Sequence, residues 1–100
     1  MPTLNTMIAS SEKRLIVGLG LTGRSVARWW HQQGIAFTAF DTRQEMASDP
    51  AILAEIDPQL ATFGEVDLDF ADDVTEMIVS PGVSLDHPLV ARATARGCRI

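Results

Sequence analysis

The chain has 100 residues, of which 46% are hydrophobic and 21% are charged, and these proportions exclude disordered and repetitive chains. That length fits one compact domain. Eight basic residues against 13 acidic ones give a formal net charge of −5, which excludes the basic surface of a nucleic-acid-binding protein. The single cysteine, Cys98, cannot form an intrachain disulfide, which is typical of proteins in the reducing cytoplasm.

Residues 1–13 are predicted to form a flexible tail, because they carry little apolar pattern. The tail lacks the basic start of a secretory signal, and the apolar run at 15–21 is interrupted by glycine and too short to span a membrane. We therefore expect a cytoplasmic protein without a membrane span, with its folded domain at residues 14–100.

Beyond the tail, short apolar runs alternate with helical patterns, which predicts an α/β fold with a parallel sheet. The continuous apolar run Leu15–Val17 is typical of a central strand that is buried on both faces. A helix is expected at Thr22–Gln33, with both Trp29 and Trp30 facing the sheet because they belong to its apolar stripe. The fold class is thus a Rossmann-like open sheet of about five parallel strands with helices on both faces.

The remaining elements follow the same alternation. Asp49 and the proline after it predict the capped start of a helix, and His87 is expected at the entry of another. A calcium loop in the acidic stretch is excluded because Asp72 occupies the position that requires glycine. We expect strands at 36–40, 60–63 and 77–79, helices at 50–56 and 87–96, a solvated connection at 64–76, and a fifth strand starting at 99–100, which indicates a fragment of a longer protein.

Three glycines between the first strand and the first helix form the string GLGLTG, which matches G-x-G-x-x-G. In this pattern Gly18 permits a tight turn, Gly20 lets the backbone approach a phosphate, and Gly23 lets the helix pack closely on the strand. The N–H groups at the helix start, near Leu21 and Thr22, then point at an anion, and the helix dipole favours negative charge there. The loop therefore predicts a phosphate site.

A polar cluster, Asp41-Thr42-Arg43, follows the second strand. Asp41 lies 18 residues after Gly23, near the place where nicotinamide-binding folds keep an acid for the ribose hydroxyls. The cluster also offers an acceptor, a hydroxyl and a guanidinium, which together suit the edge of a base. Both interpretations, a dinucleotide and a single nucleotide, follow from these residues.

Ser80 and Gly82 end another strand at the same carboxyl edge, where open parallel sheets bind ligands. The chain holds little more than half of a dinucleotide fold, which favours one nucleoside diphosphate. The alternatives are the NAD-binding half of a dehydrogenase and an interaction domain that binds no nucleotide. No nucleophile elbow, zinc-protease motif or Walker A string occurs, so we expect no catalytic residue, no metal ligand and no cofactor in this chain.

The strings GLGLTG, FDTR and SPGV, in this order, resemble the amino-terminal domain of the Mur ligases, and the resemblance covers residues 14–100. It implies that the domain holds the UDP end of UDP-N-acetylmuramoyl-L-alanine. The same resemblance implies that Gly18, Gly20 and Gly23 shape the loop. It also implies which residues contact each part of the ligand: the diphosphate is held by Leu21 and Thr22, the uracil by Asp41, Thr42 and Arg43, and the sugar by Ser80 and Gly82.

The resemblance also implies the reaction of a longer parent protein. That parent is expected to be a cytoplasmic ligase of peptidoglycan synthesis, and so of cell shape and division, that adds D-glutamate with ATP through an acyl phosphate. ATP, Mg²⁺ and D-glutamate would bind to domains beyond residue 100. This chain alone is expected to bind the UDP precursor and to catalyse nothing.

Overall fold

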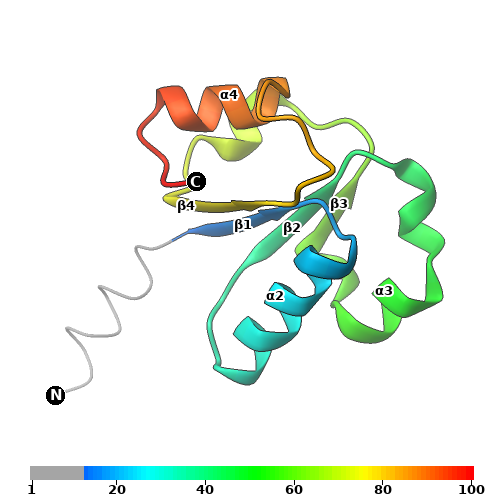
Figure 1. The fold of residues 1–100 in the computed structure, drawn as a ribbon. Helices are drawn as coiled ribbons and strands as arrows, with labels where there is room; N and C mark the ends of the chain where they lie inside the picture. The colour runs from blue at the N-terminus through cyan, green and yellow to red at the C-terminus, as the bar shows by residue number, and fades with distance from the viewer. Residues whose placement is uncertain (1–12) are drawn as a thin grey trace, which may run out of the picture.

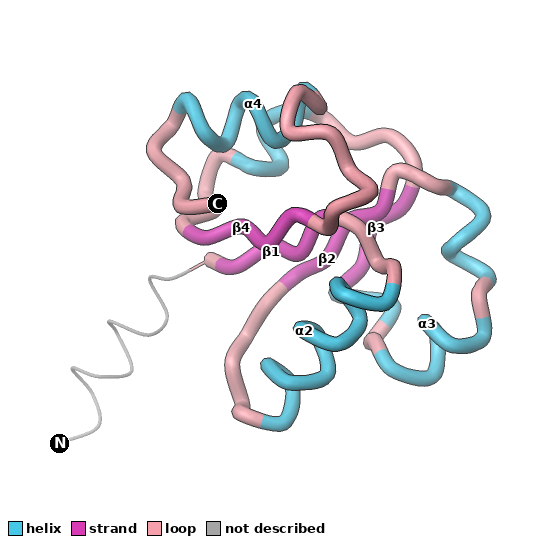
Figure 2. The backbone as a smooth tube through the Cα atoms, in the orientation of Figure 1, coloured by secondary structure: helices cyan, strands magenta, loops and turns pink. Residues whose placement is uncertain are grey.

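The computed structural model describes residues 13–100 and shows a parallel sheet of four strands in the order β3-β2-β1-β4 (Figure 1). Within residues 13–100, one α-helix connects the first strand to the second, another connects the second to the third, and a further α-helix follows the last strand (Figure 2). The element bounds are β1 Arg14–Val17, α2 Leu21–Gln32, β2 Thr38–Asp41, α3 Pro50–Glu55, β3 Ala61–Phe63, β4 Glu76–Val79 and α4 Pro88–Ala95. Apart from Lys13, the predicted tail lies outside the described residues.

The sheet is covered on both faces, which confirms the predicted α/β class. Helices α2 and α3 lie on one face, and α4 lies on the other (Figure 1). Strand β1 is central, as its apolar run predicts, and its side chains alternate between two cores. Ile16 packs in the core beneath α2 and α3, whereas Leu15 and Val17 pack in the core beneath α4.

Trp29 is the clearest departure from the helix prediction. Trp30 is 5% exposed and its ring centroid lies 5.8 Å from that of Phe37, but Trp29 is 55% exposed. Consecutive residues of an α-helix are about 100° apart, so a stripe centred on Ala27 and Trp30 turns Trp29 away from the sheet. The prediction that both tryptophans face the sheet was therefore wrong for Trp29.

The count of five strands was too high by one within residues 13–100. Arg99 makes only an isolated parallel bridge with Glu76, in which the Met77 N–H donates to the Arg99 carbonyl oxygen at 2.6 Å. One bridge does not make a strand, because a ladder needs several paired residues in succession. The remaining boundaries agree closely with the sequence prediction, and Asp49 caps α3 as expected.

The acidic connection between β3 and β4 contains one short 3₁₀ turn, Leu68–Ala71, that packs against α4. Within residues 13–100, no group of three or more potential metal ligands lies together. None of the helices in this range has the length and apolar character required to cross a bilayer.

Candidate functional site at the carboxyl edge of the sheet

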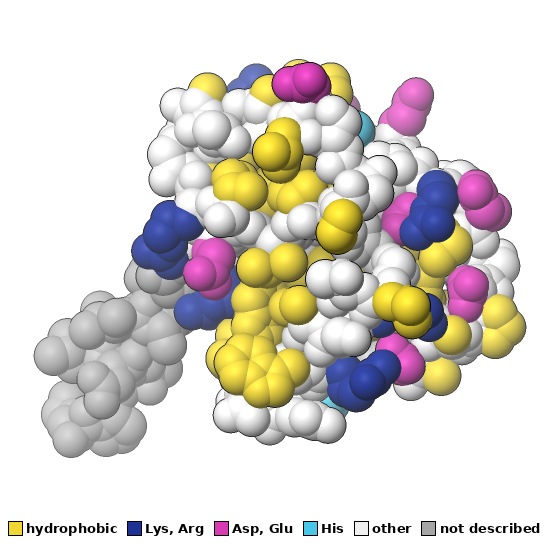
Figure 3. All heavy atoms as spheres, in the orientation of Figure 1, with side chains coloured by type: hydrophobic (Ala, Val, Ile, Leu, Met, Phe, Trp, Pro, Cys, Tyr) yellow, Lys and Arg dark blue, Asp and Glu magenta, His cyan; other side chains and the backbone are white. Residues whose placement is uncertain are grey.

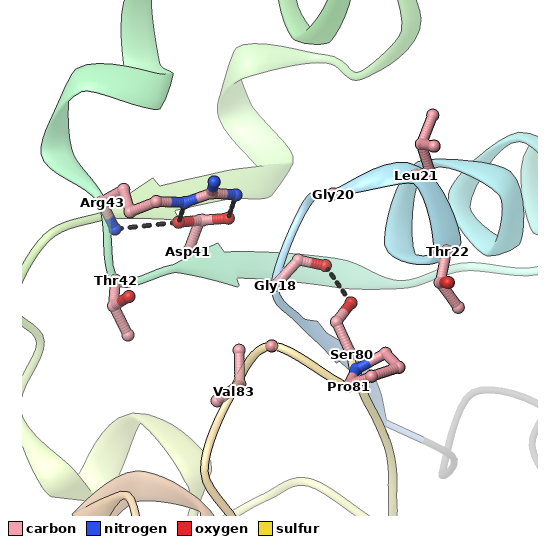
Figure 4. Close-up of a pocket in the computed structure, with 11 residues that line it drawn as sticks. Gly18, Gly20, Leu21, Thr22, Asp41, Thr42, Arg43, Ser80, Pro81 and Val83 are labelled. Atoms are coloured by element: carbon pink, nitrogen blue, oxygen red, sulfur yellow. Dashed lines mark hydrogen bonds and ion pairs between the residues drawn. The ribbon is translucent and has the colours of Figure 1, made fainter.

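The carboxyl ends of β1, β2 and β4 surround a crevice of about 360 Å³, within the size range of small-molecule sites (Figure 4). The structure thus brings the three polar strand ends together, as the parallel topology requires. Every residue predicted for the site lines the crevice except Gly23. The lining residues are Gly18, Gly20, Leu21, Thr22, Asp41, Thr42, Arg43, Ser80, Pro81, Gly82 and Val83.

Gly18 makes the turn at the floor of the crevice. Its φ of +96° lies in the left-handed region that glycine adopts most easily, and an added Cβ would lie 2.7 Å from the Cβ of Ser80. The Gly18 N–H donates to the Phe40 carbonyl oxygen at 2.7 Å, and the Ser80 hydroxyl donates to the Gly18 carbonyl oxygen at 2.8 Å. The glycine loop is therefore tied to both neighbouring strand ends.

Gly23 lies behind the loop rather than in the crevice. It is buried in the first turn of α2, where an added Cβ would overlap the Gly18 carbonyl oxygen. This contact supports the packing role expected of the third glycine, because it brings the helix onto the end of β1. Gly23 contributes to the crevice by setting the position of α2.

The N-terminus of α2 opens into the crevice without a side-chain cap. Gly20 is the N-cap residue, no side chain accepts a hydrogen bond there, and the first turn contains no acidic residue. Helices α3 and α4 differ, since Asp49 and His87 cap them. The first N–H groups of an α-helix have no intrahelical partner, and they carry the positive end of the dipole. This end of α2 is chemically suited to an anion.

Figure 4 shows how the two residues at the start of α2 lie. The Leu21 side chain points away from the Ser80 turn and is 80% exposed. The Thr22 side chain points to the same side of the helix as Ser80 and Pro81. At this position the backbone and the Thr22 hydroxyl supply polar groups, whereas the Leu21 side chain supplies none.

Asp41 is buried at the end of β2 and joins the glycine loop to Arg43. One carboxylate oxygen, Oδ2, accepts from the Leu19 N–H at 2.7 Å and from an Arg43 Nη atom at 2.9 Å. The other oxygen, Oδ1, accepts from the Arg43 N–H at 2.8 Å and from Arg43 Nε at 3.0 Å. A carboxylate has about four acceptor positions, so these four bonds occupy its capacity.

The hydrogen bonds of Asp41 also set its charge state. Burial alone would raise the pKa of this carboxyl, but the hydrogen bonds from the Arg43 side chain and from the Leu19 and Arg43 N–H groups outweigh it. The pKa of Asp41 therefore lies below its ordinary value, and the carboxylate stays ionised at neutral pH.

Arg43 faces the crevice with its guanidinium held in place by this bidentate contact (Figure 4). Its side chain is 49% exposed, although the Asp41 carboxylate beside it is almost inaccessible. One edge of the guanidinium binds Asp41. A guanidinium that is held along one edge can still stack its flat face on a planar ligand.

Two crevice residues, Pro81 and Val83, were not among the predicted site residues. Both belong to the string SPGV that carried the resemblance, but their apolar side chains gave no chemical signal. Val83 closes the crevice from the loop that follows β4, and its Cγ2 atom would lie 3.0 Å from a Cβ added to Gly18. Their contribution is the shape of the crevice.

A parallel sheet with a glycine-rich turn and an uncapped helix end at its carboxyl edge defines a Rossmann-like domain with an anion-receptive crevice. The family model described as Mur ligase MurD-like, N-terminal domain, matches residues 12–100. The chain belongs to this family.

Curated relatives agree with this assignment. The chain is 36% identical to the UDP-N-acetylmuramoylalanine--D-glutamate ligase of Pseudomonas putida, 40% identical to that of Pseudomonas fluorescens and 35% identical to that of Marinobacter nauticus. Each match covers 95% of this chain and 21% of the relative. The chain thus spans about a fifth of the length of these ligases.

Proposed function

We propose that this domain binds the UDP moiety of UDP-N-acetylmuramoyl-L-alanine for a ligase that adds D-glutamate. The observation that carries the proposal is the uncapped N-terminus of α2, which shares one crevice with the Arg43–Asp41 pair. A nucleoside diphosphate requires an anion site and a planar, polar site side by side, and the crevice offers these two.

The diphosphate is assigned to the start of α2. The N–H groups of Leu21 and Thr22 donate to the phosphate oxygens, and the Thr22 hydroxyl adds a third donor. Gly20 has no Cβ, so a phosphate approaches the backbone closely at this point. The Ser80–Gly82 turn on the opposite side of the loop is assigned to the sugar.

The uracil is assigned to Thr42 and Arg43. The guanidinium of Arg43 offers its flat face to the ring, and Thr42 offers a hydroxyl to the polar edge of the base. Asp41 acts through Arg43 and Leu19, because its oxygens are already occupied by their N–H groups. The same saturation argues against the NAD alternative, which requires this acid to accept ribose hydroxyls.

The whole reaction belongs to the longer protein. In this proposal, ATP phosphorylates the carboxylate of the nucleotide-linked alanine, and the amine of D-glutamate attacks the acyl phosphate, so that an amide forms and phosphate leaves. Mg²⁺ would offset the charge that develops on the transferred phosphoryl group. ATP, Mg²⁺ and D-glutamate are assigned to other domains, the setting to the cytoplasm, and the process to peptidoglycan synthesis.

Isothermal titration calorimetry tests the domain's part of this proposal. We expect UDP-N-acetylmuramoyl-L-alanine and UDP to bind to the 100-residue chain, and NAD to give no heat. Arg43→Ala removes the stacking surface and should weaken UDP binding by about tenfold, the effect of losing one good contact. Binding of NAD without binding of UDP would overturn the proposal.

Arg28→Ala is the matched control. Arg28 is also on the surface, with 54% of its side chain exposed, and it pairs with Glu55 through an N–O distance of 3.2 Å. It lies on α2 but does not line the crevice. If Arg28→Ala and Arg43→Ala weaken UDP binding equally, the loss of affinity comes from the change in the protein's net charge and not from a contact in the crevice.

A further inference from the structure

Arg24, in the first turn of α2, is the one arginine within residues 13–100 that forms no ion pair. Each of the other six has a nitrogen within 4.0 Å of an acidic oxygen: Arg14, Arg28, Arg43, Arg92, Arg96 and Arg99. The Nε atom of Arg24 is buried, and none of the described residues accepts a hydrogen bond from it. A buried donor without an acceptor costs free energy, so the guanidinium has a bonding capacity that the described residues leave unused.

The position of Arg24 in the helix is also unfavourable. Arg24 is the fourth residue of α2, and the first turn contains no acidic residue that could balance its charge. A cation in the first turn faces the positive end of the helix dipole and lowers the stability of the helix, whereas an anion at the same end would offset both positive charges. The unpaired guanidinium and the uncapped helix end therefore favour the same kind of partner.

The geometry of the helix places Arg24 beside the rim of the crevice. A helical side chain leans toward the N-terminus and covers the turn before its own Cα, so Arg24 covers the turn that starts at Gly20. Arg28, one turn further along the same flank, reaches Glu55 on α3 at 3.2 Å. Thr22, which lines the crevice, lies about 200° away around the helix. Arg24 and Thr22 thus flank the N-terminus of α2 from two sides, although Arg24 does not itself line the crevice.

The side chains that line the crevice supply no net positive charge for a diphosphate. The charged lining residues are Asp41 and Arg43, which pair at 2.9 Å and neutralise each other. Figure 3 shows acidic and basic side chains mixed on the side where α2 and α3 lie, with no broad basic patch among the described residues on this face. Arg24 is the charged side chain of the first turn, and because it is half-buried, salt screens its contacts less than those of an exposed cation.

We propose that Arg24 is a further ligand-binding residue, whose guanidinium donates to the phosphate group that lies at the start of α2. The ligand class is a nucleoside diphosphate, so the inference rests on the proposed function and adds a cationic contact to it. A guanidinium can bind two oxygens of one phosphate, and this contact gives Nε the acceptor that it lacks among the described residues. The backbone N–H groups of α2 and the Arg24 side chain then hold the phosphate from two directions.

Isothermal titration calorimetry of Arg24→Met tests this contact with three probes: UDP, uridine and inorganic pyrophosphate. Methionine keeps an apolar stem and removes the guanidinium. UDP and pyrophosphate should bind about tenfold or more weakly, the effect of losing a charge-assisted hydrogen bond, whereas uridine should bind unchanged. Arg24→Lys keeps the charge without the planar fork of donors and should recover part of the lost affinity.

Arg28→Met is the matched control, because it removes one positive charge from the same flank of α2 and should leave all three affinities nearly unchanged. Thermal unfolding separates ligand binding from a structural role. Without ligand, Arg24→Met should melt at or above the wild-type temperature, because it removes an unpartnered buried donor and a cation at the helix start. The inference is overturned if UDP binds equally to Arg24→Met and wild type, if Arg28→Met loses as much affinity, or if Arg24→Met lowers the melting temperature and the uridine affinity together.

The pyrophosphate titration separates this inference from the proposed function. If pyrophosphate binding depends on Arg24 in a chain that does not bind UDP, the role of Arg24 stands and the proposed nucleotide is wrong. If UDP binds independently of Arg24, the proposed function stands and the role of Arg24 is wrong. If neither UDP nor pyrophosphate binds to the wild-type chain, both proposals fail.

Discussion

The carboxylate of Asp41 links the phosphate side of the crevice to the base side. It holds the loop through the Leu19 N–H and orients the guanidinium of Arg43. A buried acceptor with four donors around it is replaced poorly by any neutral group, because the donors then lose their partner. Asp41 is therefore a positioning residue whose loss should affect stability and binding together.

Asp41→Asn tests this role. The amide keeps one acceptor oxygen but directs an N–H₂ group at donors, so we expect a loss of about 1–3 kcal/mol in the free energy of unfolding. Urea denaturation at pH 7 measures it. Asp57→Asn is the control, because Asp57 is exposed and accepts one N–H, from Gln59. Similar losses in the two variants would contradict the role given to Asp41.

The pH dependence of Asp41 has a definite sign. Its pKa is lower in the folded chain than the ordinary value of 3.8, so the unfolded chain takes up the proton first as pH falls. The stabilisation is complete above pH 3.8 and is lost as pH falls through the folded value. In urea denaturation, the difference between wild type and Asp41→Asn should therefore shrink below pH 3.8, and a constant difference would contradict the assignment.

The sequence predicted the location of these residues but not the pairing among them. Strand ends of a parallel sheet meet at one edge, so Asp41, Arg43 and Ser80 were predictable as neighbours. The saturation of Asp41 was not, because it depends on the Leu19 N–H coming within hydrogen-bond distance in three dimensions. Tertiary packing determines contacts of that kind, and they produce no recognisable pattern of residue spacing in the sequence.

At the scale of elements, the start of α2 lacks the side-chain cap that would stabilise the helix, and this leaves its first N–H groups free to bind an anion. Gly20 has an extended backbone, and an added Cβ would meet no atom within 4 Å, so the position accepts an N-cap side chain. Gly20→Asp should stabilise the chain by about 0.3 kcal/mol through the cap and weaken UDP binding by tenfold or more through charge repulsion. Thermal unfolding and calorimetry measure the two effects.

Gly20→Asn separates the cap from the charge. Asparagine caps a helix about as well as aspartate but carries no charge. We therefore expect Gly20→Asn to share the gain in stability and to lose less UDP binding than Gly20→Asp. If the two variants lose the same affinity, side-chain bulk rather than charge controls the site, and the anion role of the α2 N-terminus is wrong.

The close packing of α2 on β1 depends on Gly23. Gly23→Ala places a methyl group against the Gly18 carbonyl, and the overpacking should cost about 1–3 kcal/mol of stability. Gly20→Ala is the matched control, because its Cβ meets no neighbour. Chemical denaturation of the two variants should differ by most of that cost, and equal stability would show that the helix shifts without penalty.

The sequence patterns predicted the positions of the helices and strands well, but they did not predict the orientation of the Trp29 side chain. An apolar stripe predicts that a helix packs on a sheet, but two adjacent tryptophans cannot share one narrow contact line. Trp30 takes the place beside Phe37, and Trp29 is left exposed. The sequence pattern does not decide between two such neighbours, because the choice depends on which hole in the sheet surface accepts an indole.

For the molecule as a whole, the alternation of strands and helices was sufficient to predict the class and the position of β1 in the sheet. The predicted number of strands was wrong, because the fifth strand expected at 99–100 is not formed within residues 13–100. Arg99 pairs with Glu76 through one isolated bridge, so the strand expected to start at 99–100 is not formed within the described residues. A strand forms only where several successive residues pair with a neighbouring strand, and the residue pattern of a short segment does not predict how many of them pair.

The net charge of −5 gives a final prediction for the whole molecule. At long range the protein repels an anionic nucleotide, whereas the backbone N–H groups of α2 attract it only at contact distance. Added salt screens the repulsion more than the contact, so UDP affinity should change by less than about threefold between 20 and 200 mM NaCl. Uridine in the same calorimetric series is the uncharged control. A steep fall in UDP affinity with salt would instead indicate that exposed cationic side chains hold the diphosphate, as they do in proteins that bind nucleic acids.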